Sequence, residues 1–434
     1  MHLLYDILLR FRLNKNALTG DIEKAFLNIC VAPEHRDLLR FLWVEDVEAE
    51  KPKIVVYRFA SVLFGCISSP FLLNQTVKHH MATFSDDEEF VNSVSNSLYC
   101  DDFIGGCNSV EDALTLYEKL KTRFQQGGFN MRKWMSNCEE VLDKIGENEN
   151  SVTVDSEFAQ NTESEPTLEN VCESTKKVEE TKVLGMLWKP KVDELIFDFN
   201  VMLGASAEKN VSKREVLATT AKLFDPVGLI SPIIVPLKLV FQKLCKQNKD
   251  WDASIDESIL KEWNDALNDM KNIGNITVNR PYLSSEFDFE NVDFVELHGF
   301  SDASKTAYGA CVYVVYQLKS GERVSSLVSS KTRIAPISGE TIPRLELLSA
   351  LILARLMTSV QEALSKNVKI SQIFCWSDSQ ITLWWLASEN KVLKSFVENR
   401  VREIRSLVPV KHWRYCATKQ NPADILSRGA KHRN

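Results

Sequence analysis

The sequence predicts an α/β protein with more than one domain. The chain has 434 residues, whereas a single domain usually contains about 100–150. Hydrophobic residues make up 44% of the chain and charged residues 26%, which provides enough apolar material for packed cores and argues against disorder throughout. From residue 293 onward, short apolar runs typical of strands alternate with longer helical patterns, as in an α/β domain.

Three observations restrict the compartment. The ten cysteines are scattered, without a C-x-x-C motif or the spacing of a zinc site, which favours a reducing environment. No apolar run approaches about 18 residues, so we expect no membrane span. The N-terminal stretch MHLLYDILLRFR contains Asp6 and Arg10 and lacks the cleavage site of a secretory signal. We therefore expect a cytoplasmic protein with no membrane partner.

A strongly acidic stretch divides the chain. Residues 139–182 contain 13 acidic residues and 4 lysines, a charge of −9, so the other residues carry +2 within the total of −7. This stretch has few large apolar residues and no periodicity, and we expect a disordered insertion there. The net charge therefore does not exclude nucleic acid as a ligand of the folded parts.

The expected elements follow in order on either side of this insertion. Residues 1–138 alternate short apolar runs with turn signals. Residues 183–290 hold the strand patterns VLGMLWKP and DELIFDFNV, the helix REVLATTAKLF and a proline-rich run. The C-terminal part contains the strands VELHGFSD, YGACVYVVYQ and RVSSLVSS, the helix PRLELLSALILARLM, the strand IFCWSD, further helices and the strand KHWRYCA.

Four acidic residues in the C-terminal part are candidates for one site. Asp302 and Asp378 end strands, in GFSDAS and CWSDS, Glu346 lies in the first turns of a helix, and Asp424 lies in the short helix NPADILSRG. Side chains at strand ends and on a facing helix can converge, and four carboxylates in one pocket need divalent cations. Oxygen ligands favour Mg²⁺ or Mn²⁺ over zinc. Taken singly, each residue could instead be a turn residue or a helix N-terminal charge.

The strand–strand–strand–helix–strand order and these residues resemble a retroelement ribonuclease H domain. The resemblance implies a mixed five-stranded sheet and hydrolysis of the RNA strand of an RNA–DNA hybrid with two metal ions. It assigns the catalytic and metal-binding roles to Asp302, Glu346, Asp378 and Asp424. Many relatives have a histidine in the loop before the last aspartate, but the loop ATKQNPA has none. Either the reaction proceeds without that group or product release differs.

The N-terminal part contains a second acidic set. The motif LYCDDFIGG places Asp101 and Asp102 between two apolar runs, and Asp21 lies in the run ALTGDIEKAF. An Asp–Asp pair in such a turn is usually hairpin chemistry. In order and spacing, however, the three aspartates resemble the palm of a reverse transcriptase of the BEL/Pao class of LTR retrotransposons. This resemblance implies that Asp21, Asp101 and Asp102 bind two Mg²⁺ or Mn²⁺ ions for nucleotidyl transfer.

The palm resemblance also implies contacts with dNTPs and with an RNA or DNA template and its primer. Phe26 matches the position that excludes a ribose 2′-hydroxyl, and FGCISSP matches the motif that packs under the template base pair and the nucleotide. The implied substrate-binding residues are Phe26, Phe64, Gly65, Ser69, Pro70 and Tyr99. For Phe26 and Phe64 the alternative is core packing. Lys133 is a candidate proton donor to pyrophosphate or an ordinary solvated lysine.

These resemblances predict a domain order. We expect an α+β palm with its fingers largely missing at 1–138, the acidic insertion at 139–182, a thumb- or connection-like segment at 183–290, and a ribonuclease H-like α/β domain at 291–434 that folds alone. The run LFDPVGLISPIIVPLKLVFQKL resembles the connecting segment of BEL/Pao elements. The basic residues Arg10 and Arg12 are expected in the helix that leads into the palm.

The leading hypothesis is a retrotransposon polyprotein fragment with an incomplete RNA-directed DNA polymerase and a ribonuclease H. Its location would be the cytoplasm, retroelement particles or the nucleus, and its partners would include other segments of the polyprotein. One alternative is a catalytically silent nucleic-acid-binding remnant of a decayed element, and another is a two-metal nuclease without a role in reverse transcription. The seven carboxylates argue against the first alternative, and the palm motifs argue against the second.

Overall fold

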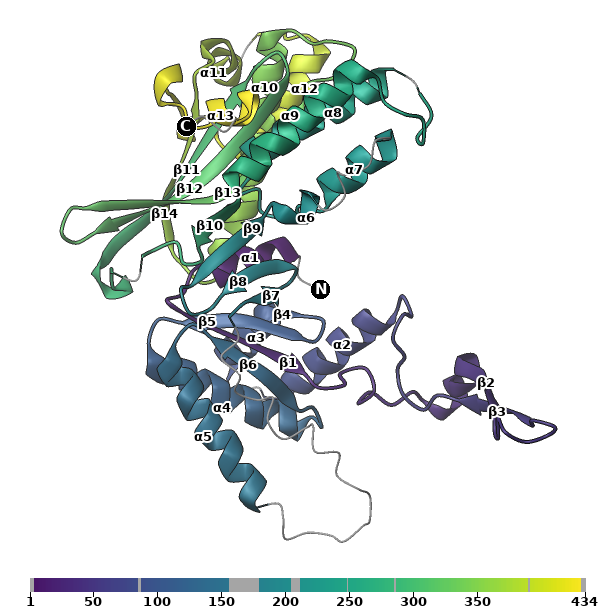
Figure 1. Cartoon of the computed structure of the whole chain (residues 1–434). Coiled ribbons are helices and arrows are strands. Elements are labelled where there is room, and N and C mark those ends of the chain that lie inside the picture. Colours follow the sequence, from purple (N-terminus) through teal and green to yellow (C-terminus); the bar gives the residue numbers. More distant parts are fainter. Residues whose placement is uncertain are drawn as a thin grey trace. The chain divides into compact units, whose positions relative to one another are not determined.

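The computed structural model describes residues 4–84, 87–155, 179–203, 211–247, 249–284, 286–388 and 391–430 (Figure 1). The chain forms two compact units. The first comprises Met1–Ile7 and Asn14–Val178, and the second comprises Leu8–Leu13 and Glu179–Asn434. A short piece of the N-terminal helix α1 (Leu4–Phe11) and the residues after it therefore belong to the second unit.

The first unit is built on a four-stranded antiparallel sheet in the order β4-β5-β1-β6. Its strands are β1 (Asn16–Ile22), β4 (Leu98–Tyr99), β5 (Asp102–Cys107) and β6 (Met131–Ser136). The helices of this unit are α2 (Ser69–Met81), α3 (Glu88–Ser97), α4 (Val110–Gln126) and α5 (Glu139–Asp155). Phe103, Leu120 and Phe124 lie in its buried core, so the apolar runs of the sequence become the packed side of the sheet and of α4.

The predicted acidic insertion does not begin where the sequence composition suggested. Residues 139–155 form α5, and the side chains of Val141 and Ile145 are buried in the core of the first unit. These two residues lie four positions apart and therefore share one helix face. The prediction of disorder is wrong for this part, because averaging over the whole acidic stretch hid a short apolar stripe at its start. The centre of the predicted insertion lies outside the described residues.

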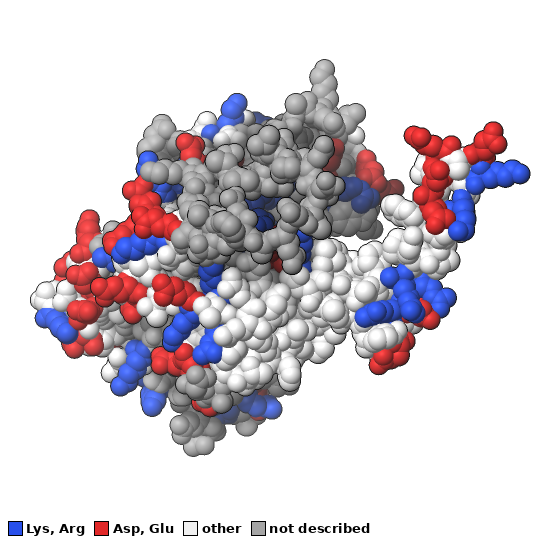
Figure 2. Space-filling model, turned by 90° about the horizontal axis from the view of Figure 1, so that it is seen from below, with Lys and Arg blue, Asp and Glu red and all other residues white. Residues whose placement is uncertain are grey.

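A two-stranded ribbon projects from the first unit. It consists of β2 (Arg40–Val44) and β3 (Ile54–Arg58) and follows the 3₁₀ helix η1 (Pro33–Leu39). Leu42, Trp43 and Val56 on this ribbon are exposed to solvent. In Figure 2, charged side chains gather at the left of the face and around the ribbon at the right, with an uncharged surface between them. The first unit thus leaves a large amount of apolar surface uncovered.

The second unit contains the mixed five-stranded sheet that the sequence predicted, in the order β13-β12-β11-β14-β15. Its strands are β11 (Val292–Ala303), β12 (Ala307–Leu318), β13 (Arg323–Ile334), β14 (Ile370–Ser377) and β15 (Trp413–Tyr415). The first three are antiparallel, and β14 and β15 run parallel to β11. Parallel pairing brings the carboxyl ends of β11 and β14 to the same edge of the sheet.

The long helix α10 (Ile342–Leu364) covers one face of this sheet. It lies so close to β11 that a Cβ atom at Gly299 would lie 2.4 Å from Cδ1 of Leu353, which explains the glycine. Three further helices belong to this part of the unit: α11 (Gln380–Ala387), α12 (Ser395–Leu407) and α13 (Asp424–Arg428). The short helix α13 packs against Phe300, whose side chain points to the opposite face from Gly299.

Helix α10 also bears on the expectation that the chain has no membrane span. Among the described residues it is the one helix long and apolar enough to cross a membrane, and 67% of the relevant window is buried within the protein. Length and composition alone therefore do not separate α10 from a membrane-spanning helix, and the expectation stays a prediction. Ser349 and Arg355 interrupt the apolar run too little to exclude such a span, and the burial of α10 is that of a core helix.

The segment before β11 is not separate from the five-stranded sheet. Helix α8 (Ser231–Lys246) lies against β13 and α13, and so covers the face opposite α10. The loop before α8 is hydrogen-bonded to β13, because the backbone N–H of Ser330 and the Ser329 hydroxyl both donate to the Val227 carbonyl, at 3.0 Å and 2.6 Å. The carboxylate of Asp225 accepts three backbone N–H groups and fixes that loop. The fold therefore does not break at residue 291.

A second, smaller sheet precedes α8 in the same unit, in the order β10-β9-β8-β7. Its strands are β7 (Thr181–Val183), β8 (Met186–Lys189), β9 (Glu194–Asp198) and β10 (Asn275–Asn279). The remaining helices are α6 (Asn200–Leu203), α7 (Lys213–Ala221) and α9 (Glu257–Ile273). The predicted strands VLGMLWKP and DELIFDFNV thus belong to one antiparallel sheet.

Two arginines join the N-terminal residues to this unit. Nε of Arg12 donates to the Arg280 carbonyl at 2.9 Å, and Nη1 of Arg12 donates to the Leu327 carbonyl at 2.9 Å. The fully buried guanidinium of Arg280 pairs with the carboxylate of Asp193, with Nε–Oδ1 at 2.6 Å. Arg12 was expected in the helix that leads into the palm, but α1 ends at Phe11 and Arg12 belongs to the second unit. The hydrogen-bond partners of Arg12 come from much later in the chain.

Candidate active sites

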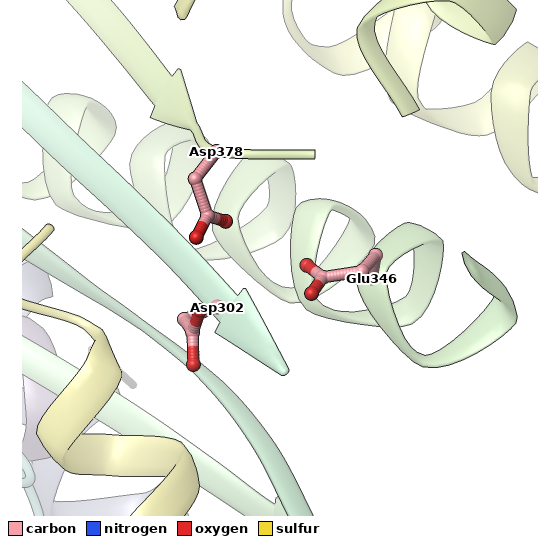
Figure 3. Close-up of side chains that lie close together, drawn as sticks. All are labelled: Asp302, Glu346 and Asp378. Carbon is pink, nitrogen blue, oxygen red and sulfur yellow. The ribbon is translucent and has the colours of Figure 1, made fainter. Parts of the chain in front are cut away.

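Three of the predicted carboxylates meet at the edge of the five-stranded sheet (Figure 3). Asp302 lies near the end of β11, Asp378 directly follows β14, and Glu346 lies in the second turn of α10. The pairing of Ser301 with Ser377 brings the ends of the two strands together. One oxygen of each carboxylate lies within 4.8 Å of the others.

The three carboxylates lack the partners that buried oxygens normally have. Asp302 is 3% exposed and Glu346 is 8% exposed. Oδ2 of Asp302, Oε2 of Glu346 and Oδ1 of Asp378 are buried without a hydrogen-bond partner. Unpaired buried anions are costly, and folded proteins compensate almost all such groups. One free oxygen on each of three converging carboxylates is the donor set of a hard divalent cation.

The electrostatics of this cluster favour protons when no cation is bound. Burial, together with the charges of Asp302 and Asp378, raises the pKa of Glu346 to about 8. Burial, followed by the charges of Asp378 and Asp424, raises the pKa of Asp302 to about 6. A cation placed among the free oxygens would lower both pKa values, because it stabilises the ionised form of each carboxylate.

The fourth predicted carboxylate is close to this cluster but is not part of it. Asp424 begins α13, and its Oδ1 accepts a hydrogen bond from Nε of Arg428 at 2.7 Å. The expectation that all four carboxylates converge is therefore met by only three of the described side chains. Asp424 is instead paired with Arg428, a partner at i+4 that the sequence analysis overlooked although the spacing was visible.

A second overlooked residue fixes the position of α13. Nδ2 of Asn421 donates to the Ser301 carbonyl at 3.0 Å, and Oδ1 of Asn421 accepts from the backbone N–H of Ala423 at 3.1 Å. Asn421 thus joins the loop before Asp424 to the strand that carries Asp302. In the sequence, the pair Asn-Pro before the helix signalled only a turn.

The palm aspartates lie on neighbouring strands of the first unit. Asp21 on β1 is the direct partner of Asp102 on β5, and the backbone N–H of Ile22 donates to the Asp101 carbonyl at 2.9 Å. The turn between β4 and β5 contains Cys100 at φ 56°, a left-handed conformation that turns the chain sharply just before the two aspartates. The predicted trio is therefore brought to one edge of the antiparallel sheet.

The palm site is more open and is partly neutralised. Burial, together with the charges of Asp101 and Asp21, raises the pKa of Asp102 to about 6. Burial is also the main cause of a raised pKa at Asp101. Nζ of Lys133 lies 3.3 Å from Oδ2 of Asp21. In the part of the chain that the structure describes, the palm oxygens do not form a group as tight as the three carboxylates at the other site.

The predicted substrate-binding residues of the first unit differ in their burial and in their contacts. The rings of Phe26 and Phe64 meet edge to face with centroids 5.1 Å apart. Phe26 is buried in the core, whereas Phe64 is 65% exposed, so core packing does not explain Phe64. Gly65 has φ +82°, which favours glycine. The hydroxyl of Ser69 donates to the Leu63 carbonyl at 2.5 Å.

Two further residues of this set belong to regular elements. Pro70 lies in the first turn of α2, where its missing N–H costs no hydrogen bond. Tyr99 lies on β4 and pairs with Asp102. Their roles toward a substrate stay predictions.

Comparison with protein families gives two matches. Residues 6–186 match the family model of reverse transcriptases (RNA-dependent DNA polymerases). Residues 212–379 match the model described as the Pao retrotransposon-like RNaseH-like domain. A search of curated protein sequences gave no match. The second model starts well before β11, in agreement with the packing of α8 on the sheet.

Solved structures with the same fold come from foamy viral protease-reverse transcriptase. The complex with an RNA/DNA hybrid has a TM-score of 0.53 and 13% identity, and the match covers 100% of this chain and 48% of that chain. The dRH form with double-stranded DNA gives a TM-score of 0.52, 14% identity and coverage of 97% and 60%. A further complex with double-stranded DNA has a TM-score of 0.52 and 14% identity, and the match covers 97% of this chain and 72% of that chain. The chain thus spans about half of the first of these proteins.

These matches confirm the fold and the family that the motifs predicted. The carboxylate cluster lies within the residues that match the RNaseH-like model, and the aspartates on β1 and β5 lie within the reverse transcriptase match. The chain therefore combines a reverse transcriptase domain with a Pao retrotransposon-like RNaseH-like domain.

Proposed function

We propose that the second unit hydrolyses the RNA strand of RNA–DNA hybrids with two divalent cations, Mg²⁺ or Mn²⁺. The observation that carries this proposal is the set of three converging carboxylates, two of them on buried residues, each with one buried oxygen that lacks a partner. Bound cations would supply the activation of a water molecule and the stabilisation of the leaving oxygen in a phosphodiester displacement. The fold it shares with a reverse transcriptase solved with an RNA/DNA hybrid supports this substrate class.

The chain's own residues would prepare the site in two ways. Asp302, Glu346 and Asp378 hold their free oxygens toward one another before any cation arrives, so little side-chain reorganisation is needed. Glu346 retains its proton near neutral pH in the metal-free protein and releases it when a cation binds, whereas Asp302, whose pKa is raised to about 6, holds its proton only at mildly acidic pH. Lys331 and Arg333 are exposed on β13 and would contact the phosphates of the hybrid.

A second candidate function is nucleotidyl transfer at the palm. Asp21, Asp101 and Asp102 lie together at one edge of the β1–β5 pair, and the raised pKa of Asp102 shows that its charge is poorly compensated in the absence of a cation. We propose that these aspartates hold two divalent cations for the triphosphate of a dNTP and the primer end. Exposed Phe64 and buried Phe26 would contact the nucleotide.

The decisive experiment is cleavage of a labelled RNA–DNA hybrid by the purified full chain in Mg²⁺. We expect cleavage by the wild type, none by Asp378→Asn, and unchanged cleavage by Asp102→Asn, which is the matched control at the palm. Hybrid binding without cleavage by the wild type would instead favour a silent nucleic-acid-binding remnant. Primer extension with dNTPs by the same samples tests the palm, with the roles of the two variants reversed.

A further inference from the structure

Arg428 ends α13 and lies beside the carboxylate cluster. Its Nε donates to Oδ1 of Asp424 at 2.7 Å, and its side chain is 65% exposed. The guanidinium also acts on the cluster, since its charge opposes the rise in the pKa of Asp302. The guanidinium of Arg428 therefore pairs with the carboxylate of Asp424, next to the three carboxylates that each have an oxygen without a partner.

Helix α13 itself is held firmly, so Asp424 can join the cluster only by a change of its side chain. The Ser304 hydroxyl donates to the Ser427 carbonyl at 2.8 Å, and the N–H of Ala430 donates to the Pro232 carbonyl at 2.9 Å. Asn421 fixes the preceding loop on β11. With the backbone fixed at both ends, the ion pair with Arg428 is what keeps Oδ1 of Asp424 engaged.

We propose that Arg428 is a positioning residue that competes with the second divalent cation for Asp424, so that the two cations bind with unequal affinity. The proposal rests on the proposed nuclease function. Asp302, Glu346 and Asp378 offer free oxygens to a first cation at once. A second cation that needs Asp424 must displace Arg428 and also bind against its positive charge.

The size of the effect follows from the exposure of the pair. Ion pairs between exposed side chains are weak, so the guanidinium exchanges readily for a divalent cation. Removing Arg428 abolishes the competing hydrogen bond and the repulsion together. We expect Arg428→Gln to tighten the second binding step by about three- to tenfold and to tighten the first step much less, because the first cation does not need the Asp424 carboxylate.

The test is a Mn²⁺ titration of the full chain followed by electron paramagnetic resonance, without nucleic acid. All samples carry Asp102→Asn, which weakens binding at the palm. We expect one tight and one weak Mn²⁺ at the nuclease site, a tighter weak site in Arg428→Gln, and loss of the weak site in Asp424→Asn. The matched control is Arg402→Gln, which removes an exposed i,i+4 ion pair with Glu398 on α12 and should change neither constant.

The outcomes separate this inference from the proposed function. Two Mn²⁺ sites whose constants are the same with and without Arg428 would overturn the competition and leave the nuclease proposal standing. A weaker second site in Arg428→Gln would also overturn it, because it would make Arg428 a support of the site. If Asp378→Asn bound Mn²⁺ as the wild type does, no Mn²⁺ would be held by the carboxylate cluster, and the proposed function itself would be contradicted. Thermal unfolding of each variant, compared with wild type, verifies that the fold is retained.

Discussion

The two carboxylate sites of this chain differ in how complete they are. At the proposed nuclease site, two neighbouring parallel strands and a covering helix bring one oxygen of each of three carboxylates to within 4.8 Å of the others. At the palm, an antiparallel strand pair presents Asp21, Asp101 and Asp102 at an open edge, and Lys133 neutralises part of their charge. The carboxylate oxygens of the proposed nuclease site thus already converge without a cation. The palm aspartates lie at an open edge, where a bound substrate would have to complete the site.

The surroundings of the sites differ in the same direction. The nuclease sheet is covered by α10 on one face and by α8 and α13 on the other. The first unit exposes Trp43, Phe64 and Phe71, together with much of the β2–β3 ribbon. Exposed apolar patches of this kind mark surfaces that another molecule or segment covers. The comparison therefore predicts different sensitivity of the two units to mutation, pH and metal ions.

The largest expected effect concerns Glu346. Glu346→Gln should lower hybrid cleavage by about 10²–10³-fold or more, because it replaces one of the three anionic oxygen ligands with a weaker, neutral amide oxygen. The same variant should unfold at a higher temperature than wild type at pH 8 without metal, since it removes an uncompensated buried anion. The measurements are a cleavage assay and thermal unfolding in EDTA. A less stable variant would mean that the cluster is already compensated in the metal-free protein.

The next effect concerns the second unit alone. Arg280→Ala should lower its free energy of unfolding by about 3 kcal/mol, because it removes the charged partner of the Asp193 carboxylate and leaves the Trp188 indole N–H as a neutral donor to it. Chemical denaturation followed by tryptophan fluorescence and by limited proteolysis of each unit measures this change. The first unit should keep its own transition. An equal loss of unfolding free energy in both units would show that they do not unfold independently.

The third effect is a pH dependence. In the metal-free protein the folded state keeps the proton of Glu346 up to a pKa of about 8, whereas the unfolded chain releases it near 4.5. The unfolded state binds fewer protons between these values, so stability should fall by about 2–4 kcal/mol as the pH rises from 4.5 to 8. Mg²⁺ should restore stability at pH 8. Thermal unfolding across this pH range tests the sign, and Glu346→Gln should lose the part of the fall that lies above about pH 6, since burial also raises the pKa of Asp302 to about 6.

The smallest effect concerns Lys133 at the palm. Its ion pair with Asp21 is exposed, so Lys133→Ala should change the free energy of unfolding by less than about 1 kcal/mol. Thermal unfolding at low and high salt is sufficient to measure it. A larger loss of unfolding free energy would show that the Lys133–Asp21 ion pair contributes substantially to the stability of the first unit.

The sequence predicted the elements better than the contacts between them. The positions of Asp302 and Asp378 followed from strand patterns, because a parallel α/β sheet places strand ends at one edge. The separation of Asp424 from the cluster did not follow, since it depends on one hydrogen bond to Arg428. The packing of α8 on β13 was equally invisible, because no local pattern states which distant face a helix will cover.

The predicted boundary at residue 291 illustrates the same limit. The run LFDPVGLISPIIVPLKLVFQKL suggested a connecting segment separate from the next domain, but the loop at Val227 is hydrogen-bonded to Ser329 and Ser330 of β13. We therefore expect residues 291–434 alone to expose the face that α8 covers and to unfold without cooperativity. The division of the chain into four parts stays a prediction that expression of such fragments would check.

The β2–β3 ribbon has a consequence for the kinetics of the first unit. A two-stranded ribbon without a covering layer is only marginally stable in water, so its local opening costs far less free energy than unfolding of the β1–β5 pair. Backbone amides of Phe41 and Val55 should exchange their hydrogens through that local opening, independently of denaturant. Those of Leu18 and Ile104 should exchange only when the whole unit unfolds. The first unit should thus show two regimes of hydrogen exchange: fast exchange by local opening of the β2–β3 ribbon, and slow exchange by global unfolding in the strands that carry the aspartates.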